Sequence, residues 1–252
     1  MHIETRGSGL DLVMLHGWAM HGGIFAPFAD ALAPHFHLHL VDLPGHGFTR
    51  EDTGTLDPAD CAQRIAVATP RAIWLGWSLG GLVALRAALD RPDHIRGLVL
   101  IASSPRFVVG ADWPEGVASN VFGEFGAGLA RDYRGTIERF LALEALGSDQ
   151  TRVELRDLKA HVFERGEPAR AALEQGLRIL DTVDLRSEMA RLKTPSLWIA
   201  GRRDRLIKPT AMQWAAAQSH GRYLECNSGH APFLAHAKSL ADAITAFAAE
   251  LP

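Results

Sequence analysis

The sequence predicts an α/β fold, in which a mostly parallel central sheet is flanked by helices and carries a helical insertion. Three observations support this prediction. Short apolar runs rich in Val, Ile and Leu, typical of strands buried on both faces, alternate with segments of helical periodicity. Between about residues 105 and 185 only helical patterns occur. The length of 252 residues suits one sizeable domain with such an insertion.

The predicted strands are apolar runs spread over the chain outside the insertion. In chain order they are Leu12–Leu15, Leu38–Leu43, Ala72–Gly76, Gly97–Ala102, Ser196–Ala200 and a weaker run, Tyr223–Cys226. The predicted helices between and after them are Pro58–Ala68, Leu79–Leu89, Pro209–Gln218 and Ser239–Glu250. Because strands and helices alternate, most of the strands are expected to run parallel.

The region without strands is predicted to be a helical cap. Its helical patterns cover Arg134–Leu146, Asp149–Glu164 and Glu167–Leu180. We therefore expect a core made of residues 1–104 and 186–252, with a cap of residues 105–185 inserted after the sixth strand. Such a cap would lie above the carboxyl ends of the strands, where open α/β sheets bind ligands.

Charge and cysteine content exclude several classes of partner. The net charge is −3, so the chain has no overall basic field for nucleic acid. Its two cysteines, Cys61 and Cys226, form no CxxC pair, which is compatible with a reducing compartment. The amino-terminal segment lacks a signal-peptide pattern, and apolar runs such as Gly97–Ala102 are far too short to span a membrane. We expect a cytoplasmic protein that binds neither nucleic acid nor membrane.

The stretch Gly76-Trp-Ser78-Leu-Gly80 matches the G-x-S-x-G pattern between a predicted strand and a predicted helix. In this context the pattern is that of a nucleophile elbow, a sharp turn that holds a serine at the edge of the sheet. A side chain at either glycine would crowd the turn or the packing of helix on strand. Ser78 is therefore the predicted nucleophile. The alternative is that Ser78 only caps the helix in a plain turn.

A serine nucleophile needs a base and a carboxylate that orients the base. In this kind of fold they follow the serine in the order Asp or Glu, then His. Asp204 lies in a loop after Ser196–Ala200, and His230 lies in a loop after Tyr223–Cys226. Their order and placement predict that both are catalytic. Considered separately, Asp204 is also compatible with a turn aspartate and His230 with a surface histidine.

Two main-chain amides are predicted to form the oxyanion hole. One belongs to Leu79, the residue after the nucleophile, and the other to Trp18 in the loop that follows Leu12–Leu15. The ring of Trp18 is expected either to wall the acyl pocket or simply to pack. His16 is expected to brace this loop through hydrogen bonds rather than to react.

Three histidines, His35, His37 and His39, lie on one side of an extended segment. Such a set could ligate zinc, but no carboxylate or cysteine lies beside it in the sequence. We therefore expect no metal site and no cofactor. Cys226 is best explained as a buried strand-end cysteine, since Ser78 already occupies the elbow.

The chain resembles the α/β-hydrolase superfamily from end to end, through the motifs HGW, DLPGHG, GWSLGG, GRRD and SGHAPF. Within it, the chain is similar to the pimeloyl-[acyl-carrier protein] methyl ester esterases of biotin synthesis, through LHLVDLPGHG, AIWLGWSLGGLVA, ASSP, ERFLALEALG, TVDLR and GHAPF. The resemblance implies an α/β-hydrolase fold and a serine carboxylesterase. Its substrate would be the methyl ester of a pimeloyl chain on acyl carrier protein, and its products pimeloyl-[acyl-carrier protein] and methanol.

The resemblance also implies roles for residues of this sequence. The triad would be Ser78, Asp204 and His230. The matching substrate contacts are Trp18, Ser78, Leu79, Phe140, Leu141, Ala142, Leu143, Glu144 and His230. The matching contacts to the acidic carrier are Arg139, Arg152 and Arg156, whereas a further family arginine falls at Gly135, with Arg134 adjacent.

The cap pattern agrees in part with a carrier-binding function. Arg152, Arg156 and Lys159 recur at helical spacing and form a basic stripe beside an apolar face. The alternative is a solvated helix face, because residues 131–159 hold six basic and six acidic residues.

The residues leave two other functions open. One is a general short-chain carboxylesterase, or a lactone or C–C bond hydrolase, that uses the same triad. The other is a non-catalytic ligand-binding protein of the same fold, against which the intact Ser78, Asp204 and His230 argue. We expect a monomer in each case.

Overall fold

The computed structural model describes residues 1–148 and 150–252. Within them the strands form one sheet in the order β1-β3-β2-β4-β5-β6-β7. β1 pairs antiparallel with β3, and the other neighbouring pairs are parallel. The mostly parallel sheet predicted from the sequence is thus confirmed. The strand bounds are β1 His2–Arg6, β2 Leu10–Leu15, β3 Phe36–Asp42, β4 Ala72–Trp77, β5 Ile95–Ile101, β6 Ser196–Gly201 and β7 Arg222–Cys226.

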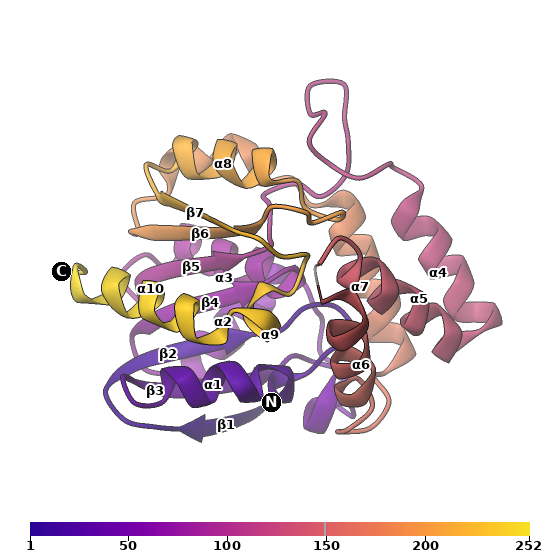
Figure 1. Cartoon of the computed structure of the whole chain (residues 1–252), viewed down its shortest axis with the longest axis horizontal. Coiled ribbons are helices and arrows are strands. Elements are labelled where there is room, and N and C mark those ends of the chain that lie inside the picture. Colours follow the sequence, from indigo (N-terminus) through magenta and orange to yellow (C-terminus); the bar gives the residue numbers. More distant parts are fainter. Residues whose placement is uncertain (149) are drawn as a thin grey trace.

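Helices cover both faces of the sheet (Figure 1). α1 (Ala26–Leu32) and α10 (Ala237–Ala249) pack together on one face, and α2 (Pro58–Ala68) and α3 (Leu79–Asp90) pack together on the other. α8 (Pro209–Gln218) packs against β6 and β7. Burial on both faces explains why the central strands are continuous apolar runs in the sequence. Shorter elements are the 3₁₀ helices η1 (Gly22–Phe25), η2 (Gly47–Thr49) and η3 (Arg186–Arg191), and the short helix α9 (Pro232–Ala235).

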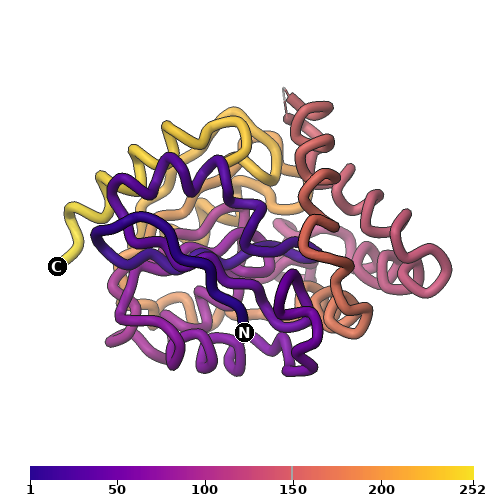
Figure 2. Tube along the Cα trace, turned by 90° about the horizontal axis from the view of Figure 1, so that it is seen from below, coloured from indigo at the N-terminus to yellow at the C-terminus, as the bar shows by residue number. Residues whose placement is uncertain are grey.

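The α-helices that the structure describes between β5 and β6 form a separate layer, which we call the cap. They are α4 (Val121–Arg131), α5 (Tyr133–Ala145), α6 (Thr151–His161) and α7 (Arg170–Thr182). Figures 1 and 2 show them beyond one end of the strands, on the side where the parallel strands terminate. The prediction that the insertion follows a sixth strand was wrong. In the described chain five strands, β1 to β5, precede the insertion, so it follows the fifth strand.

Most predicted elements are present, and the differences have simple causes. α2 and α8 have the predicted bounds. α6 begins at Thr151, and its predicted first residue, Asp149, lies outside the described residues. Apart from the short elements η1, η2, η3 and α9, the elements that were not predicted are β1, α1 and α4. β1 is a half-buried edge strand with a polar sequence. α4 contains Gly123, Gly126 and Gly128, which lower its helix propensity.

Arg165 anchors the cap to the core. It lies between α6 and α7, and its guanidinium contacts the carboxylate of Asp42 at 3.2 Å and that of Glu4. The guanidinium also lies 4.9 Å from the ring centre of Phe48. The side chain of Arg165 is 10% exposed and that of Asp42 is 0% exposed. Removing the guanidinium would leave the buried Asp42 carboxylate without the positive charge that offsets its loss of hydration.

We expect Arg165→Ala to lower the free energy of unfolding by about 3 kcal/mol, because it breaks a buried ion pair. The control is Arg170→Ala, which removes an exposed pair with Glu174 within α7 and should cost less than about 1 kcal/mol. Urea unfolding followed by circular dichroism measures both values. Equal losses in the two variants would contradict the anchoring role of Arg165.

Candidate active site

The turn between β4 and α3 places the Ser78 side chain at the carboxyl edge of the sheet. Ser78 has φ 53° and ψ −119°, a strained conformation for a residue other than glycine. The turn is closed by the Ser103 hydroxyl, which donates to the Ser78 carbonyl at 2.9 Å. A Cβ atom at Gly76 would lie 2.4 Å from the Gly80 carbonyl oxygen, and one at Gly80 would lie 2.3 Å from that of Leu15. The sequence therefore needs both glycines for this turn to form.

Three side chains that are far apart in the sequence meet at this edge. His230 Nε2 lies 2.9 Å from Ser78 Oγ, and His230 Nδ1 lies 2.8 Å from Asp204 Oδ2. The Asp204 carboxylate can only accept a hydrogen bond, so His230 Nδ1 carries the proton and donates a hydrogen bond to Asp204. His230 Nε2 is then free to accept a hydrogen bond from the Ser78 hydroxyl. All three residues are buried, with Ser78 1% exposed. The arrangement can perform nucleophilic catalysis with general-base assistance.

The loops that carry Asp204 and His230 are held by further hydrogen bonds. Asp204 Oδ1 accepts from the amides of Leu206 and Ile207 at 2.8 and 3.0 Å, which orients the carboxylate. The indole of Trp77, on β4, donates to the His230 carbonyl at 2.8 Å. His230 is thus positioned by a residue of the strand that leads to Ser78.

The pKa of His230 is raised by its surroundings. Burial alone would lower the pKa, because it penalises the imidazolium, but the charge of Asp204 and its hydrogen bond outweigh burial. The neutral imidazole that can accept the Ser78 proton is therefore populated only above a raised pKa. Activity that depends on this base should decline as the pH falls.

The loop after β2 lies close to Ser78. A Cβ atom at Gly17 would lie 3.3 Å from the Ser78 Cβ, so the loop passes close to the serine. His16 Nδ1 is 2.8 Å from the Gly17 carbonyl, and its Nε2 accepts from the Leu43 amide at 3.0 Å. These bonds require the neutral tautomer, and the pKa of His16 lies well below its usual value, mainly through burial. His16 braces the loop, as expected.

The Trp18 ring joins the core to the cap. Its Nε1 donates to the Leu173 carbonyl of α7 at 2.8 Å, and its ring centre lies 4.5 Å from that of Phe140 on α5. α7 approaches so closely that a Cβ atom at Gly176 would lie 2.7 Å from the Trp18 ring. Trp18 is fully buried. Its side chain is therefore a packing contact between the core and the cap, which agrees with the second of the two roles expected from the sequence.

The predicted amide donors of the oxyanion hole belong to the residue after Ser78 and to the residue after Gly17, which approaches Ser78. Leu79 is the first residue of α3, so its N–H has no carbonyl partner within the helix and points out of the helix start. Trp18 directly follows the close approach at Gly17. The partial positive charge of the α3 amino terminus adds to the field at this point.

The cap stretch Phe140–Glu144 is only partly directed toward the core. Phe140, Leu141 and Glu144 are buried, Leu143 is half-buried, and Ala142 is exposed. The structure therefore does not bring the Ala142 side chain to the serine. This alternation follows from helical geometry, because residues three and four apart share a face.

Glu144 is a buried acid beside His230. Its main-chain carbonyl accepts from the His230 amide at 3.3 Å, and both carboxyl oxygens are buried without a hydrogen-bond partner among the described residues. Burial raises the pKa of Glu144 to about 8. The group is therefore mainly neutral at pH 7 and adds negative charge near His230 only at higher pH. Its position on the buried face of α5, where apolar residues recur, is the sequence signal that could have revealed it.

The predicted carrier-binding arginines are on the cap surface. Arg139 and Arg156 have 58% and 73% exposed side chains, paired with Asp132 and Asp157, and Arg152 is also exposed. The structure does not bring any of the three to Ser78. Their exposure is what contact with a partner protein requires.

A groove of about 640 Å³ lies between α4 and α5. Its walls include Phe125 and Leu143, and Arg131 and Arg139 also line it. The ring of Phe125 lies 5.1 Å from that of Phe140, which in turn contacts Trp18. Aromatic contacts thus lead from the groove to the loop beside the serine.

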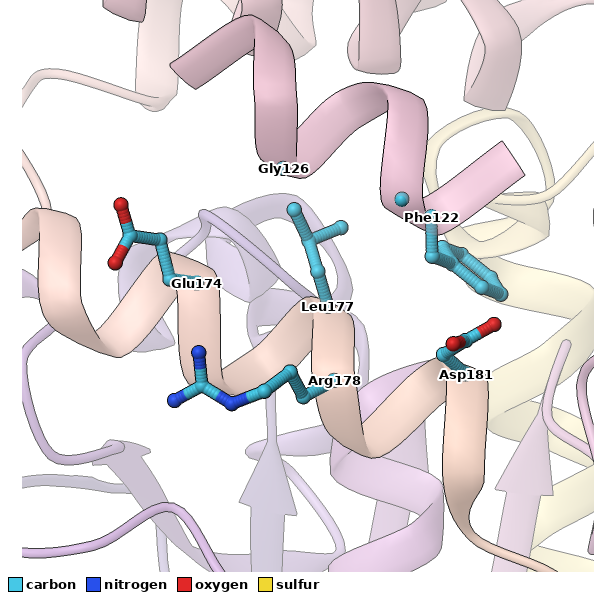
Figure 3. Close-up of a pocket in the computed structure, with 7 residues that line it drawn as sticks. Phe122, Gly126, Glu174, Leu177, Arg178 and Asp181 are labelled. Carbon is cyan, nitrogen blue, oxygen red and sulfur yellow. The ribbon is translucent and has the colours of Figure 1, made fainter. Parts of the chain in front are cut away.

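A second, smaller pocket, of about 270 Å³, lies between α4 and α7. Figure 3 shows the Leu177 side chain pointing from α7 toward α4, with Glu174, Arg178 and Asp181 on the same helix. No predicted site residue lines this pocket. It is therefore separate from the arrangement around Ser78.

Comparison with known proteins identifies the family. Residues 12–243 match the alpha/beta hydrolase family. The chain is 55% identical over 254 residues, with 100% of both chains covered, to the pimeloyl-[acyl-carrier protein] methyl ester esterase of Xanthomonas campestris pv. campestris (strain B100). The chain belongs to the alpha/beta hydrolase family, among the pimeloyl-[acyl-carrier protein] methyl ester esterases. The protein of that name from Stenotrophomonas maltophilia (strain K279a) is 54% identical over 253 residues, covering 100% of this chain and 97% of its own.

Solved structures share the alpha/beta hydrolase architecture at low sequence identity. An esterase from Exiguobacterium antarcticum aligns with a TM-score of 0.85 at 19% identity, covering 99% of this chain and 95% of its own. The enol-lactonase from Burkholderia xenovorans LB400 has a TM-score of 0.83 at 19% identity, with 99% and 96% covered. These likenesses confirm the predicted fold. In the described part of the chain, none of the helices is both long and apolar enough to cross a membrane.

The buried histidines His46 and His16 should make the stability of this alpha/beta hydrolase sensitive to acid. Burial lowers the pKa of His46 to about 4, whereas an unfolded histidine titrates near 6.5. Between these two pKa values the unfolded state binds a proton at His46 and the folded state does not. The free energy of unfolding therefore falls as the pH drops below about 6.5. His16, whose pKa is also lowered, acts in the same direction.

For His46 alone we expect a loss of about 2 kcal/mol between pH 7.5 and pH 5. Urea unfolding at the two pH values measures the loss. The His46→Gln variant should lose correspondingly less over the same interval, because glutamine does not titrate. An identical pH dependence in the variant and the parent protein would contradict the assignment of a neutral His46.

Proposed function

We propose that this chain is a serine carboxylesterase that hydrolyses the methyl ester of pimeloyl-[acyl-carrier protein] to pimeloyl-[acyl-carrier protein] and methanol in biotin synthesis. The observation that carries the proposal is the hydrogen-bonded set Ser78, His230 and Asp204. It occurs in a chain that is 55% identical, from end to end, to esterases named for this substrate.

The first half of the reaction forms an acyl-enzyme. His230 Nε2 takes the proton of the Ser78 hydroxyl while Oγ attacks the ester carbonyl. The amides of Leu79 and Trp18 stabilise the oxyanion of the tetrahedral intermediate, a contribution of about 10²–10³ in rate for each donor. When the intermediate collapses, the bond to the methoxy oxygen breaks, and the imidazolium gives its proton to that oxygen. Methanol leaves.

The second half of the reaction releases the acid. A water molecule gives a proton to His230 and attacks the acyl-enzyme carbonyl, and the collapse of this second intermediate returns the proton to Ser78 Oγ. Asp204 keeps the imidazole in the Nδ1–H tautomer and stabilises its charged form in both halves. The residues need neither metal nor organic cofactor for these steps.

The cap supplies the binding surface in this proposal. The groove between α4 and α5 would hold the extended acyl chain, with Phe140, Leu143 and Trp18 along its path to the serine. Because Ser78 is 1% exposed, we infer that the cap, residues 105–185, shifts relative to the core, residues 1–104 and 186–252, when the substrate enters. We further infer a monomer that acts in the cytoplasm and has acyl carrier protein as its protein partner.

Exposed arginines would dock the acidic carrier. The double variant Arg152→Glu and Arg156→Glu is expected to lower kcat/KM for pimeloyl-carrier methyl ester by about tenfold or more, because opposite charges steer and hold charged partners. The rate with a small free ester should stay within about twofold. Steady-state kinetics with both substrates measures the ratio.

The matched control is Arg91→Glu, a charge reversal at an exposed position at the end of α3 remote from the cap. It should leave both rates unchanged. Equal losses on carrier-bound and free esters in the double variant would remove the docking proposal while leaving the esterase proposal intact.

Growth without biotin tests the proposed substrate. The chain should restore growth of a bacterial strain that lacks its pimeloyl-carrier methyl ester esterase, and the Ser78→Ala variant should not. A protein that hydrolyses small esters but fails to restore growth would instead be the general short-chain carboxylesterase that the residues also allow.

A further inference from the structure

The histidine-rich segment of β3 acquires an acidic partner in the folded chain. Asp11, on β2, is the register partner of His37 on β3. His37 and His39 are two residues apart, so their side chains leave the same face of the strand. No carboxylate lies beside these histidines in the sequence, which is why no metal site was expected. The parallel pairing of β2 with β3 brings the carboxylate of Asp11 to them.

The three side chains converge on one point. Asp11 Oδ1 lies 3.0 Å from His37 Nδ1 and 2.8 Å from His39 Nε2. All the potential ligand atoms lie within 4.8 Å of one another, and the two ring centres are 4.6 Å apart. One imidazole therefore presents Nδ1 and the other Nε2 to the same carboxylate oxygen.

We propose that Asp11, His37 and His39 form a binding site for a divalent transition-metal ion, with Zn²⁺ as the best-fitting ion. Two imidazole nitrogens and a carboxylate are a donor set that zinc prefers, and water would complete the tetrahedron. Donors about 2.0–2.1 Å from zinc lie roughly 3.3 Å from one another in that geometry. The observed separations of 2.8 and 3.0 Å would have to widen by about 0.3–0.5 Å. The two imidazole nitrogens, which lie within 4.8 Å of one another, would have to settle at the same spacing.

The surroundings suit a bound ion. The side chains of His37 and Asp11 are 40% and 29% exposed, so an ion can enter and keep a water ligand, whereas that of His39 is 8% exposed and held in place. The His230–Asp204 pair differs, because both side chains are buried and the free imidazole nitrogen already faces Ser78.

The site is structural rather than catalytic. Asp11 and His37 lie near the starts of β2 and β3, whereas Ser78 follows the end of β4, which runs parallel to β2. The two sites therefore lie at opposite ends of the parallel strands. A bound ion would cross-link β2 to β3 and stabilise the folded state by binding it in preference to the unfolded chain. The proposal does not depend on the esterase function.

Calorimetric titration of the tag-free, chelator-treated protein with ZnCl₂ tests this site. We expect saturable binding of one ion per chain and a higher Tm in thermal unfolding with ZnCl₂ than with chelator. MgCl₂ should raise neither signal, because Mg²⁺ prefers oxygen ligands. Hydrolysis of a small ester should proceed at the same rate with and without the ion, after excess metal is removed.

The variants His37→Gln and Asp11→Asn should each weaken Zn²⁺ binding by at least about tenfold and abolish the Tm shift. Both positions are partly exposed, so these variants should fold, as far-ultraviolet circular dichroism will show. The matched control is His35→Gln, which removes an exposed histidine of the same segment that lies outside the group. The proposal is overturned if the parent protein binds no Zn²⁺ at micromolar concentration, or if His37→Gln and Asp11→Asn bind it as tightly as the parent.

Discussion

Replacing Ser78 with alanine is expected to abolish ester hydrolysis, with a loss in kcat of about 10⁶-fold, because the triad acts as a unit. The fold should survive. Alanine keeps the Cβ atom of serine, and Ala19 and Ala102 already adopt positive φ values of 64° and 44° in this chain. Steady-state hydrolysis of p-nitrophenyl butyrate measures the loss, and thermal unfolding checks the fold.

A second serine provides the control for this variant. Ser228 is buried two residues before His230, and its hydroxyl has no hydrogen-bond partner among the described residues. Ser228→Ala should keep activity close to that of the parent protein. Near-normal turnover by Ser78→Ala would instead show that another group is the nucleophile.

Replacing Asp204 with asparagine is expected to lower kcat by about 10⁴-fold. The asparagine oxygen can still accept from the amides of Leu206 and Ile207, so the loop should keep its shape. Its NH₂ group would then face His230 Nδ1 as a donor. The imidazole would be forced to carry its proton on Nε2, where it cannot accept the proton of Ser78.

Kinetics over a pH range separates this tautomer effect from general damage. The folded Asp204→Asn protein should show the same thermal unfolding behaviour as the parent protein but a much lower kcat at every pH. Glu144→Gln is the control, because Glu144 is mainly neutral at pH 7 and glutamine preserves its shape. A loss of less than about tenfold in Asp204→Asn would contradict the orienting role of the carboxylate.

Much of the candidate site could be predicted because strand ends bring distant residues together. Ser78, Asp204 and His230 each follow a strand of one parallel sheet, and the carboxyl ends of such strands share an edge. Glycines with no room for a Cβ atom made the elbow recognisable. These signals are local, so a single sequence shows them.

The remainder depends on contacts between elements, which a single sequence does not specify. The hydrogen bond from Trp18 to the Leu173 carbonyl joins the core to α7 across 155 residues. Asp11 meets His37 only because β2 pairs with β3. α4 was missed because its glycines contradict its helical state, which packing against α5 and α7 stabilises.

The mass spectrum of the carrier after incubation with this protein tests the central claim most directly. Acyl carrier protein bearing a pimeloyl methyl ester should lose the mass of one methylene group, because the methyl ester becomes a carboxylate while the acyl chain stays attached. The loss should be absent with Ser78→Ala. Release of the whole acyl chain from the carrier, or no change in mass with folded and active protein, would contradict the account.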